Sequence, residues 1–213
     1  MNIIRSKHSS KNSMLPAHYA LTEILIVLAC YFSIKGLWFN KNFYASVGIF
    51  LIGLTALIGA IRFGLIDNNL MMNLNRVLAI FSGILALSLI SIQIISNNIS
   101  KKIANITLAV SVLAFLSLFI WTQPIIKLSL LFIWSIFSII LTFSLPQKSF
   151  LIKLFKAFLM SLILIAFITL SKQLGIFTKS LSPSLSFHLY HILIATWVIL
   201  VGYTISQNNT LKS

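Results

Sequence analysis

Seven long apolar runs constrain this chain more than any other feature of its sequence. Each holds about 20 residues, the length that a helix needs to cross the hydrocarbon core of a bilayer. The runs lie at 20–39, 43–65, 75–96, 103–122, 125–145, 150–170 and 184–205. Short polar segments separate them, such as DNNLMMN at 67–73. Because short loops make consecutive helices antiparallel neighbours, we predict an all-α fold, an integral membrane bundle of seven transmembrane helices.

The charge content supports a membrane location. Only 8% of the 213 residues are charged, whereas a soluble domain has about 25%. The 16 Lys and Arg residues stand against two acids, Glu23 and Asp67, which gives a net charge of +14. Most of these cations fall in the gaps between apolar runs, where they meet anionic headgroups. We therefore expect the lipid bilayer and anionic lipid headgroups as partners, and no nucleic acid.

The chain divides into three segments. Residues 1–19 form a polar, basic N-terminal segment, residues 20–205 the transmembrane domain, and residues 206–213 a short polar tail. No small-residue cleavage pattern follows the first run, so we expect it to be a retained helix and not a signal peptide. The Lys and Arg residues divide evenly between the two faces. Setting aside Arg62 and Arg76, as residues within helices, tips the balance toward a cytoplasmic C-terminus.

Small residues gather on one side of the second run. Ala56, Ala60 and Gly64 recur every four residues, and Gly53 and Gly59 widen the stripe. Such a stripe lets a neighbouring helix approach closely. We interpret it as helix packing.

Seven alternating spans bring five polar residues to a similar depth in one leaflet. These residues are Glu23, Arg62, Arg76, His188 and His191. Ionisable groups inside a span are costly and need a partner or a reason. We predict an ion pair between Glu23 and Arg62. Equally, such a pair would only lock the first two spans, or both groups would extend to the interface.

Two of the four histidines, His188 and His191, are three residues apart and share one helix face. This spacing could present both imidazoles to one metal or one proton path, with His18, Glu23 or Asp67 supplying further ligands. The alternative is a pair of interfacial histidines in an aromatic belt. Because no third histidine falls within a span, we favour the belt over a zinc site.

Three stretches carry a resemblance to a known family. They are ALTEIL at 20–25, LIGAIRFG at 57–64 and HLYHIL at 188–193. In order and layout the chain resembles the CREST superfamily of alkaline ceramidases, progestin and adipoQ receptors and haemolysin-III-like proteins, and is most similar to its uncharacterised bacterial members. The resemblance implies a seven-span fold and a bacterial inner-membrane location. The enzymes of that superfamily hold zinc and hydrolyse lipid amides, so the resemblance also implies a zinc site and this activity.

The chain departs from the family's zinc site at several positions. His191 matches the second span-seven ligand, but His188 is three residues before it, where the family has four. Arg62 stands at the span-two histidine position, and Ile58 stands at that of the serine. The aspartate position falls near Asn73, unless Asp67 replaces it. A guanidinium repels a cation and does not deprotonate. We therefore expect this chain to share the family's fold but not its zinc chemistry.

Three functions follow from these observations. The first is a non-catalytic membrane protein, without a cofactor, whose polar layer is structural or binds a lipid headgroup. The second is a divergent, metal-dependent hydrolase of lipid amides that holds zinc through His188 and His191. The third is a small proton-coupled transporter in which Glu23 and the histidines titrate. We favour the first, because no catalytic sequence motif is present.

Overall fold

The computed structural model describes residues 17–66, 68–120 and 182–210, together with positions 126, 129–130, 133–134, 136–137 and 140. Five helices lie in the three continuous ranges: α1 (Tyr19–Phe39), α2 (Phe43–Gly64), α3 (Asn69–Asn98), α4 (Lys101–Ile120) and α7 (Pro183–Thr210). No strand occurs among these residues, so the all-α prediction is confirmed for them. The runs predicted at 125–145 and 150–170 lie largely outside the described residues.

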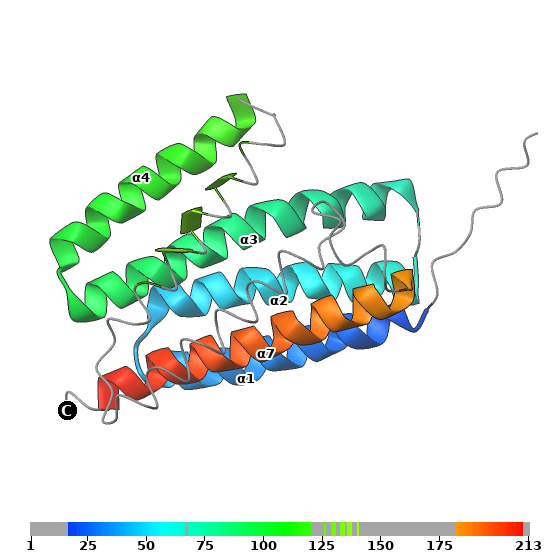
Figure 1. Ribbon diagram of the computed structural model, residues 1–213, viewed down its shortest axis with the longest axis horizontal. Helices are drawn as coiled ribbons and strands as arrows, with labels where there is room; N and C mark the ends of the chain where they lie inside the picture. The colour runs from blue at the N-terminus through cyan, green and yellow to red at the C-terminus, as the bar shows by residue number, and fades with distance from the viewer. Residues whose placement is uncertain are drawn as a thin grey trace, which may run out of the picture.

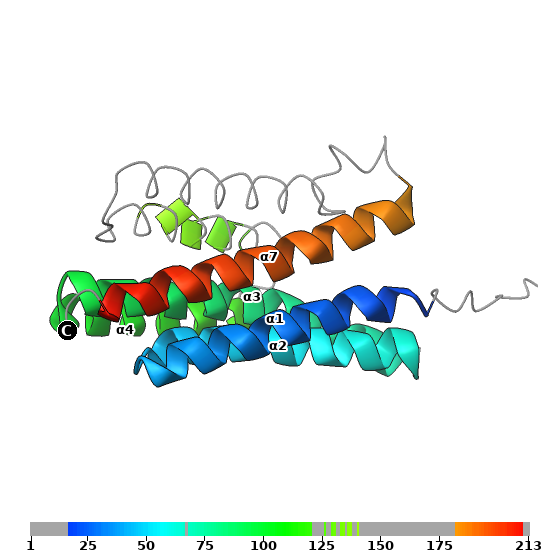
Figure 2. The same cartoon turned by 90° about the horizontal axis from the view of Figure 1, so that it is seen from below.

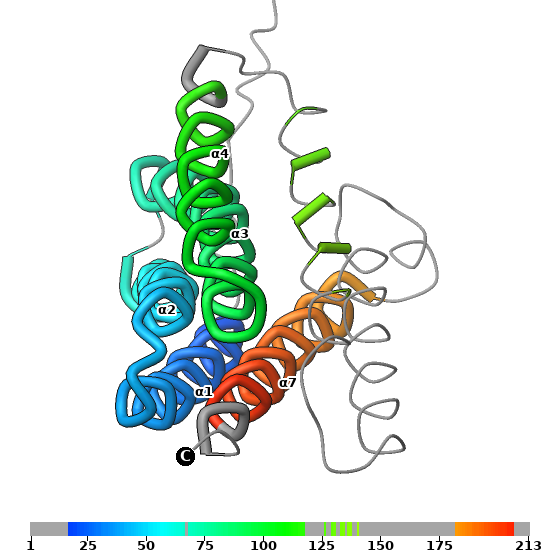
Figure 3. Tube along the Cα trace, turned by 90° about the vertical axis from the view of Figure 1, so that its left-hand side faces the viewer, coloured from blue at the N-terminus to red at the C-terminus, as the bar shows by residue number. Residues whose placement is uncertain are grey.

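The helices pack in the order α7, α1, α2, α3, α4 (Figure 1). Helices α1 to α4 follow one another as antiparallel neighbours, as their short connections require. Helix α7 instead lies along α1 and runs in the same direction (Figure 2). Contacts of Thr22 with His188 and of Ser33 with Val198 join residues 166 and 165 positions apart, as parallel packing requires. Figure 3 shows the bundle end on, with α1 between α2 and α7.

The outer surface of the bundle is apolar. Helices α1, α2 and α3 and residues Pro183–Ser206 of α7 are each long and apolar enough to cross a membrane. Large apolar side chains such as Leu21, Phe39 and Leu113 are at least two-thirds exposed, which is unfavourable in water and favourable in lipid. The chain is an integral membrane protein.

Helix α3 begins at Asn69, six residues before the start of the predicted run at 75, so that predicted boundary is wrong. The side chain of Asn68 accepts a hydrogen bond of 2.8 Å from the Met71 backbone N–H, so Asn68 caps the helix. The segment at 67–73, predicted as a separator, therefore contains the first turn of α3. A helix of 30 residues is about 45 Å long and exceeds the hydrocarbon core. Helix α7 likewise continues past 205 to Thr210.

Glycines of α2 allow α1 to approach closely. A Cβ at Gly53 would lie 3.0 Å from the Cβ of Cys30, and one at Gly64 would lie 3.4 Å from that of Ala20. Between these two contacts, Gly59 faces Glu23. The small-residue face predicted for the second run thus packs on α1, and one of its glycines contacts a residue of the polar layer.

Candidate functional site

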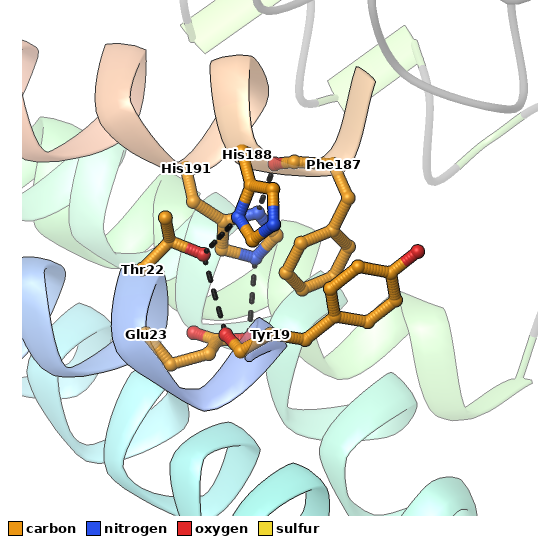
Figure 4. A network of polar contacts seen from close by, with 6 residues as sticks. All are labelled: Tyr19, Thr22, Glu23, Phe187, His188 and His191. Carbon is orange, nitrogen blue, oxygen red and sulfur yellow. Dashed lines mark hydrogen bonds and ion pairs between the residues drawn. The ribbon is translucent and has the colours of Figure 1, made fainter. Parts of the chain in front are cut away.

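A buried ion pair joins the first and last helices (Figure 4). The Oε1 atom of Glu23, on α1, lies 3.1 Å from the Nε2 atom of His191, on α7. The two residues are only 6% and 8% exposed. A charged group this deeply buried needs a partner. The pair therefore links α1 to α7 in the interior of the bundle.

Four helices meet at the Glu23 carboxylate. A Cβ at Gly59 of α2 would lie 2.5 Å from Glu23 Oε1 and 3.1 Å from the side-chain nitrogen of Asn75, on α3. Asn75 is buried, at 9% exposed. The missing side chain at position 59 is thus what gives the carboxylate room. Any larger residue there would displace it.

The tautomer of His191 follows from its second nitrogen. Its Nδ1 atom lies 2.7 Å from the backbone oxygen of Phe187, and a carbonyl oxygen only accepts hydrogen bonds. Nδ1 therefore carries a proton. The contact of Nε2 with Glu23 then needs a second proton between the two atoms, either as an imidazolium beside a carboxylate or as a carboxylic acid beside a neutral imidazole. In both forms one proton lies between Nε2 and the carboxylate, and the pair has no net charge.

Aromatic rings cover the pair on the side of the bundle end at which α1 and α7 begin. Phe187 stacks on the His191 ring at a centroid distance of 3.9 Å, and Tyr19 stacks on Phe187 at 4.2 Å. Phe63 of α2 meets both Tyr19 and Phe187 edge to face. Aromatic neighbours were expected for these histidines. Their stacking fixes the plane of the His191 ring, and so aims Nε2 at Glu23.

The other two described histidines lie between the pair and the surface. His188, half-buried, has its Nδ1 atom 3.3 Å from the Thr22 hydroxyl. His18, exposed, has its Nε2 atom 3.0 Å from the Ser184 hydroxyl, and its ring lies 5.1 Å from that of His188. Exposure thus falls from His18 through His188 to His191. Groups that can carry protons lie along this line.

The predicted partner of Glu23 is corrected by this geometry. The carboxylate pairs with His191 of α7 and not with Arg62. The reason is the rotation of α2, which turns Gly59 toward the carboxylate. The Arg62 guanidinium lies over the ring of Phe63, 4.7 Å from its centroid, a favourable cation–π arrangement.

Arg76, also assigned to the polar layer, is exposed, and its buried neighbour Asn75 is the residue that faces the site. Sequence reasoning missed Gly59, Asn75 and Thr22 as parts of the site. Asn75 carried a usable signal, since an amide at the start of an apolar run needs a polar partner.

Zinc binding by His188 and His191 stays a prediction. In the described part of the chain, no group of three or more His, Cys, Asp or Glu side chains is placed to hold a metal ion. The Nδ1 atoms of both histidines already face protein oxygens. His191 Nε2 faces Glu23, so these three nitrogens have protein partners.

No protein-family model, no curated protein and no solved structure matches this chain significantly. The resemblance to the CREST superfamily therefore stays a prediction as well, and the function has to be argued from the site.

Proposed function

We propose that this chain is a seven-span membrane protein that binds a proton at the Glu23–His191 pair and couples proton release to movement of α1 against α7, as a small proton-coupled carrier does. The observation that carries the proposal is the hydrogen bond of His191 Nδ1 to the Phe187 carbonyl. That bond leaves Nε2 dependent on a proton for its contact with Glu23.

The direction of the coupling follows from the same geometry. If the proton leaves, a carboxylate oxygen and an imidazole lone pair face each other in a site that is less than one-tenth exposed. A buried polar group that loses its partner costs about 1–3 kcal/mol, and a charged group costs more. The deprotonated site therefore gains from separation of α1 and α7 and from entry of water. Low pH favours the closed bundle, and high pH favours the open one.

His188 and His18 supply the route by which the proton reaches the pair. An imidazole can take up a proton at one nitrogen and release it from the other. The two rings lie in contact distance of each other, with the more exposed one at the bundle end. We propose that protons enter from the face at which α1 and α7 begin.

The seven-span count is part of the proposal. Helix α4 runs toward the end of the bundle where α7 begins (Figure 1). We propose that the two apolar runs predicted at 125–145 and 150–170 supply one crossing out and one back between these helices. We further propose the bacterial inner membrane, with a cytoplasmic C-terminus, as the location.

Proton movement in vesicles tests the proposal. The purified protein is reconstituted with a pH-sensitive dye inside, and a membrane potential is imposed. We expect a rate of internal pH change well above that of protein-free vesicles, and a loss of at least about tenfold in Glu23→Gln, which keeps the shape but cannot carry the charge. Asp67→Asn removes the chain's other carboxylate and is the matched control.

Equal rates in the wild type and Glu23→Gln would overturn the proposal and favour a structural or headgroup-binding role for the polar layer. Metal analysis of the same preparation addresses the hydrolase. Stoichiometric zinc that is lost in His188→Ala and His191→Ala would favour the enzyme over the carrier.

A further inference from the structure

A second feature lies at the opposite end of α1 and does not involve the Glu23–His191 pair. An open groove of about 710 Å³ runs along the outer side of α1 and α2, within the size range of pockets that hold small ligands. Its lining residues are Tyr31, Ile34, Lys35, Trp38, Phe39 and Phe50. Five of these six side chains are apolar or aromatic, and one is a cation.

The groove is built by one stripe of α1. Residues 31, 34, 35 and 38 follow the spacing that places side chains on one helix face, and Phe50 closes the groove from α2. Tyr31 lies deepest along the helix, whereas Lys35 is four residues from the end of α1 at Phe39. The groove is therefore apolar at depth and positively charged near the membrane surface.

A second lysine lies at the mouth of the groove. Trp38 also lines an adjoining hollow with Lys41 and Phe43. The Lys41 backbone N–H donates to the Trp38 carbonyl at 3.0 Å, and its φ of 57° is the left-handed conformation that lysine seldom adopts. The turn between α1 and α2 thus brings the Lys41 backbone beside Trp38. Both lysines are exposed.

No acidic side chain balances these cations in the described part of the chain. Glu23 is the acid that the structure describes, and it lies 12 positions before Lys35, paired with His191. That separation is about 18 Å along a helix. An occupant of the groove therefore has to bring its own negative charge at the surface end and an apolar body at the deep end.

We propose that this groove binds one anionic phospholipid, with its phosphate on Lys35 and Lys41 and an acyl chain along Tyr31, Ile34 and Phe50. Lysine is a common ligand of phosphate, and basic residues at this depth attract anionic lipids. A second copy of the chain fits less well, because a two-fold interface repeats each contact and would bring four lysines together.

Fluorescence quenching in nanodiscs tests the proposal. Brominated phosphatidylglycerol or brominated phosphatidylcholine is added at equal mole fraction, and the signal of Trp38 is obtained as the difference between the wild type and Trp38→Phe. We expect phosphatidylglycerol to quench Trp38 several-fold more strongly. In Lys35→Gln/Lys41→Gln this preference should be lost and the two lipids should quench equally, because each lysine near the surface contributes about 1 kcal/mol to the binding of an anionic lipid. Lys35→Arg/Lys41→Arg should keep the preference.

The matched control is Lys101→Gln/Lys102→Gln, which removes the same charge from the same face, at the start of α4. We expect this variant to keep the preference. Equal quenching of the wild type by the two lipids, or an equal loss in both glutamine variants, would overturn the proposal, since the preference would then be absent or would reflect only the overall charge of the face. All four lysines are exposed, so the substitutions leave the core unchanged.

Discussion

A methyl group added at position 59 tests the candidate site without changing any of its ionisable groups. In Gly59→Ala the new Cβ would lie 2.5 Å from Glu23 Oε1 and 2.6 Å from its carboxyl carbon. Non-bonded carbon and oxygen atoms need about 3.5 Å, so the carboxylate has to move by about 1 Å. Its contact with His191 is now 3.1 Å. Because Oε1 is the atom that contacts His191, a move of that size disturbs the length or the angle of this hydrogen bond.

The cost can be worked from these contacts. A hydrogen bond to a charged group contributes about 1.5–3 kcal/mol, and breaking a buried pair costs up to about 5 kcal/mol. The carboxylate lies at the end of a flexible side chain, so we expect the lower figure, about 2–3 kcal/mol. Alanine recovers about 1 kcal/mol over glycine within a helix. The free energy of unfolding should therefore fall by about 1–2 kcal/mol.

The assay is unfolding of the purified protein in mixed micelles by a denaturing detergent, followed by circular dichroism. Gly36→Ala, in α1, is the matched control, because a Cβ there has no neighbour within 4 Å. We expect this control to be neutral or slightly stabilising. In a Glu23→Ala background the carboxylate is absent, so Gly59→Ala should cost nothing. If Gly59→Ala is as harmless as Gly36→Ala, or if its cost persists without Glu23, our account of the site is wrong.

Two further substitutions test the packing of the bundle away from the site. Gly202→Ala would place a Cβ 2.7 Å from that of Ser33, so it should weaken the contact of α1 with α7 by about 1–3 kcal/mol. Ser33→Gly should restore part of this loss in the same unfolding assay, and a double variant no better than Gly202→Ala would contradict the close approach. Asn97 bonds both Asn42 and Gln93 at 2.8 Å, so Asn97→Leu should cost about 1–2 kcal/mol. A change within 0.5 kcal/mol would contradict a role for this network in holding α2 against α3.

The depth of the polar residues could be predicted from the sequence, but their pairing could not. Alternating spans place Glu23 and His191 near the same face, and the structure brings them within 3.1 Å. Depth along a helix follows from counting residues. Which partner a side chain meets depends on the rotation of each helix about its axis. Apolar residues on every side, as in these spans, leave that rotation undetermined.

The choice of Arg62 as the partner of Glu23 was wrong for this reason. Both residues lie at the expected level, and opposite charges attract, but α2 turns Gly59 toward the carboxylate. Gly59 was assigned to packing because a glycine in a span usually serves packing. That is also true here, since the atom packed against it is an oxygen of Glu23.

The helix ends were predictable where the helix coincides with an apolar run. The bounds of α1 and α2 differ from the predicted runs by one residue at most. The apolar run does not mark the start of α3, because the first turn of that helix is polar and the Asn68 cap extends the helix beyond the run.

The parallel packing of the first helix on the last has a consequence for how the protein is made. The partners in this contact are more than 160 residues apart, as Thr22 and His188 show. At about 5–20 residues per second, the ribosome needs roughly ten to thirty seconds to add that length. During this interval Glu23 is already in the bilayer while His191 does not yet exist. An ionisable group within a span is costly until it has a partner. Glu23 therefore waits in the bilayer without His191, and the site is complete only when α7 arrives.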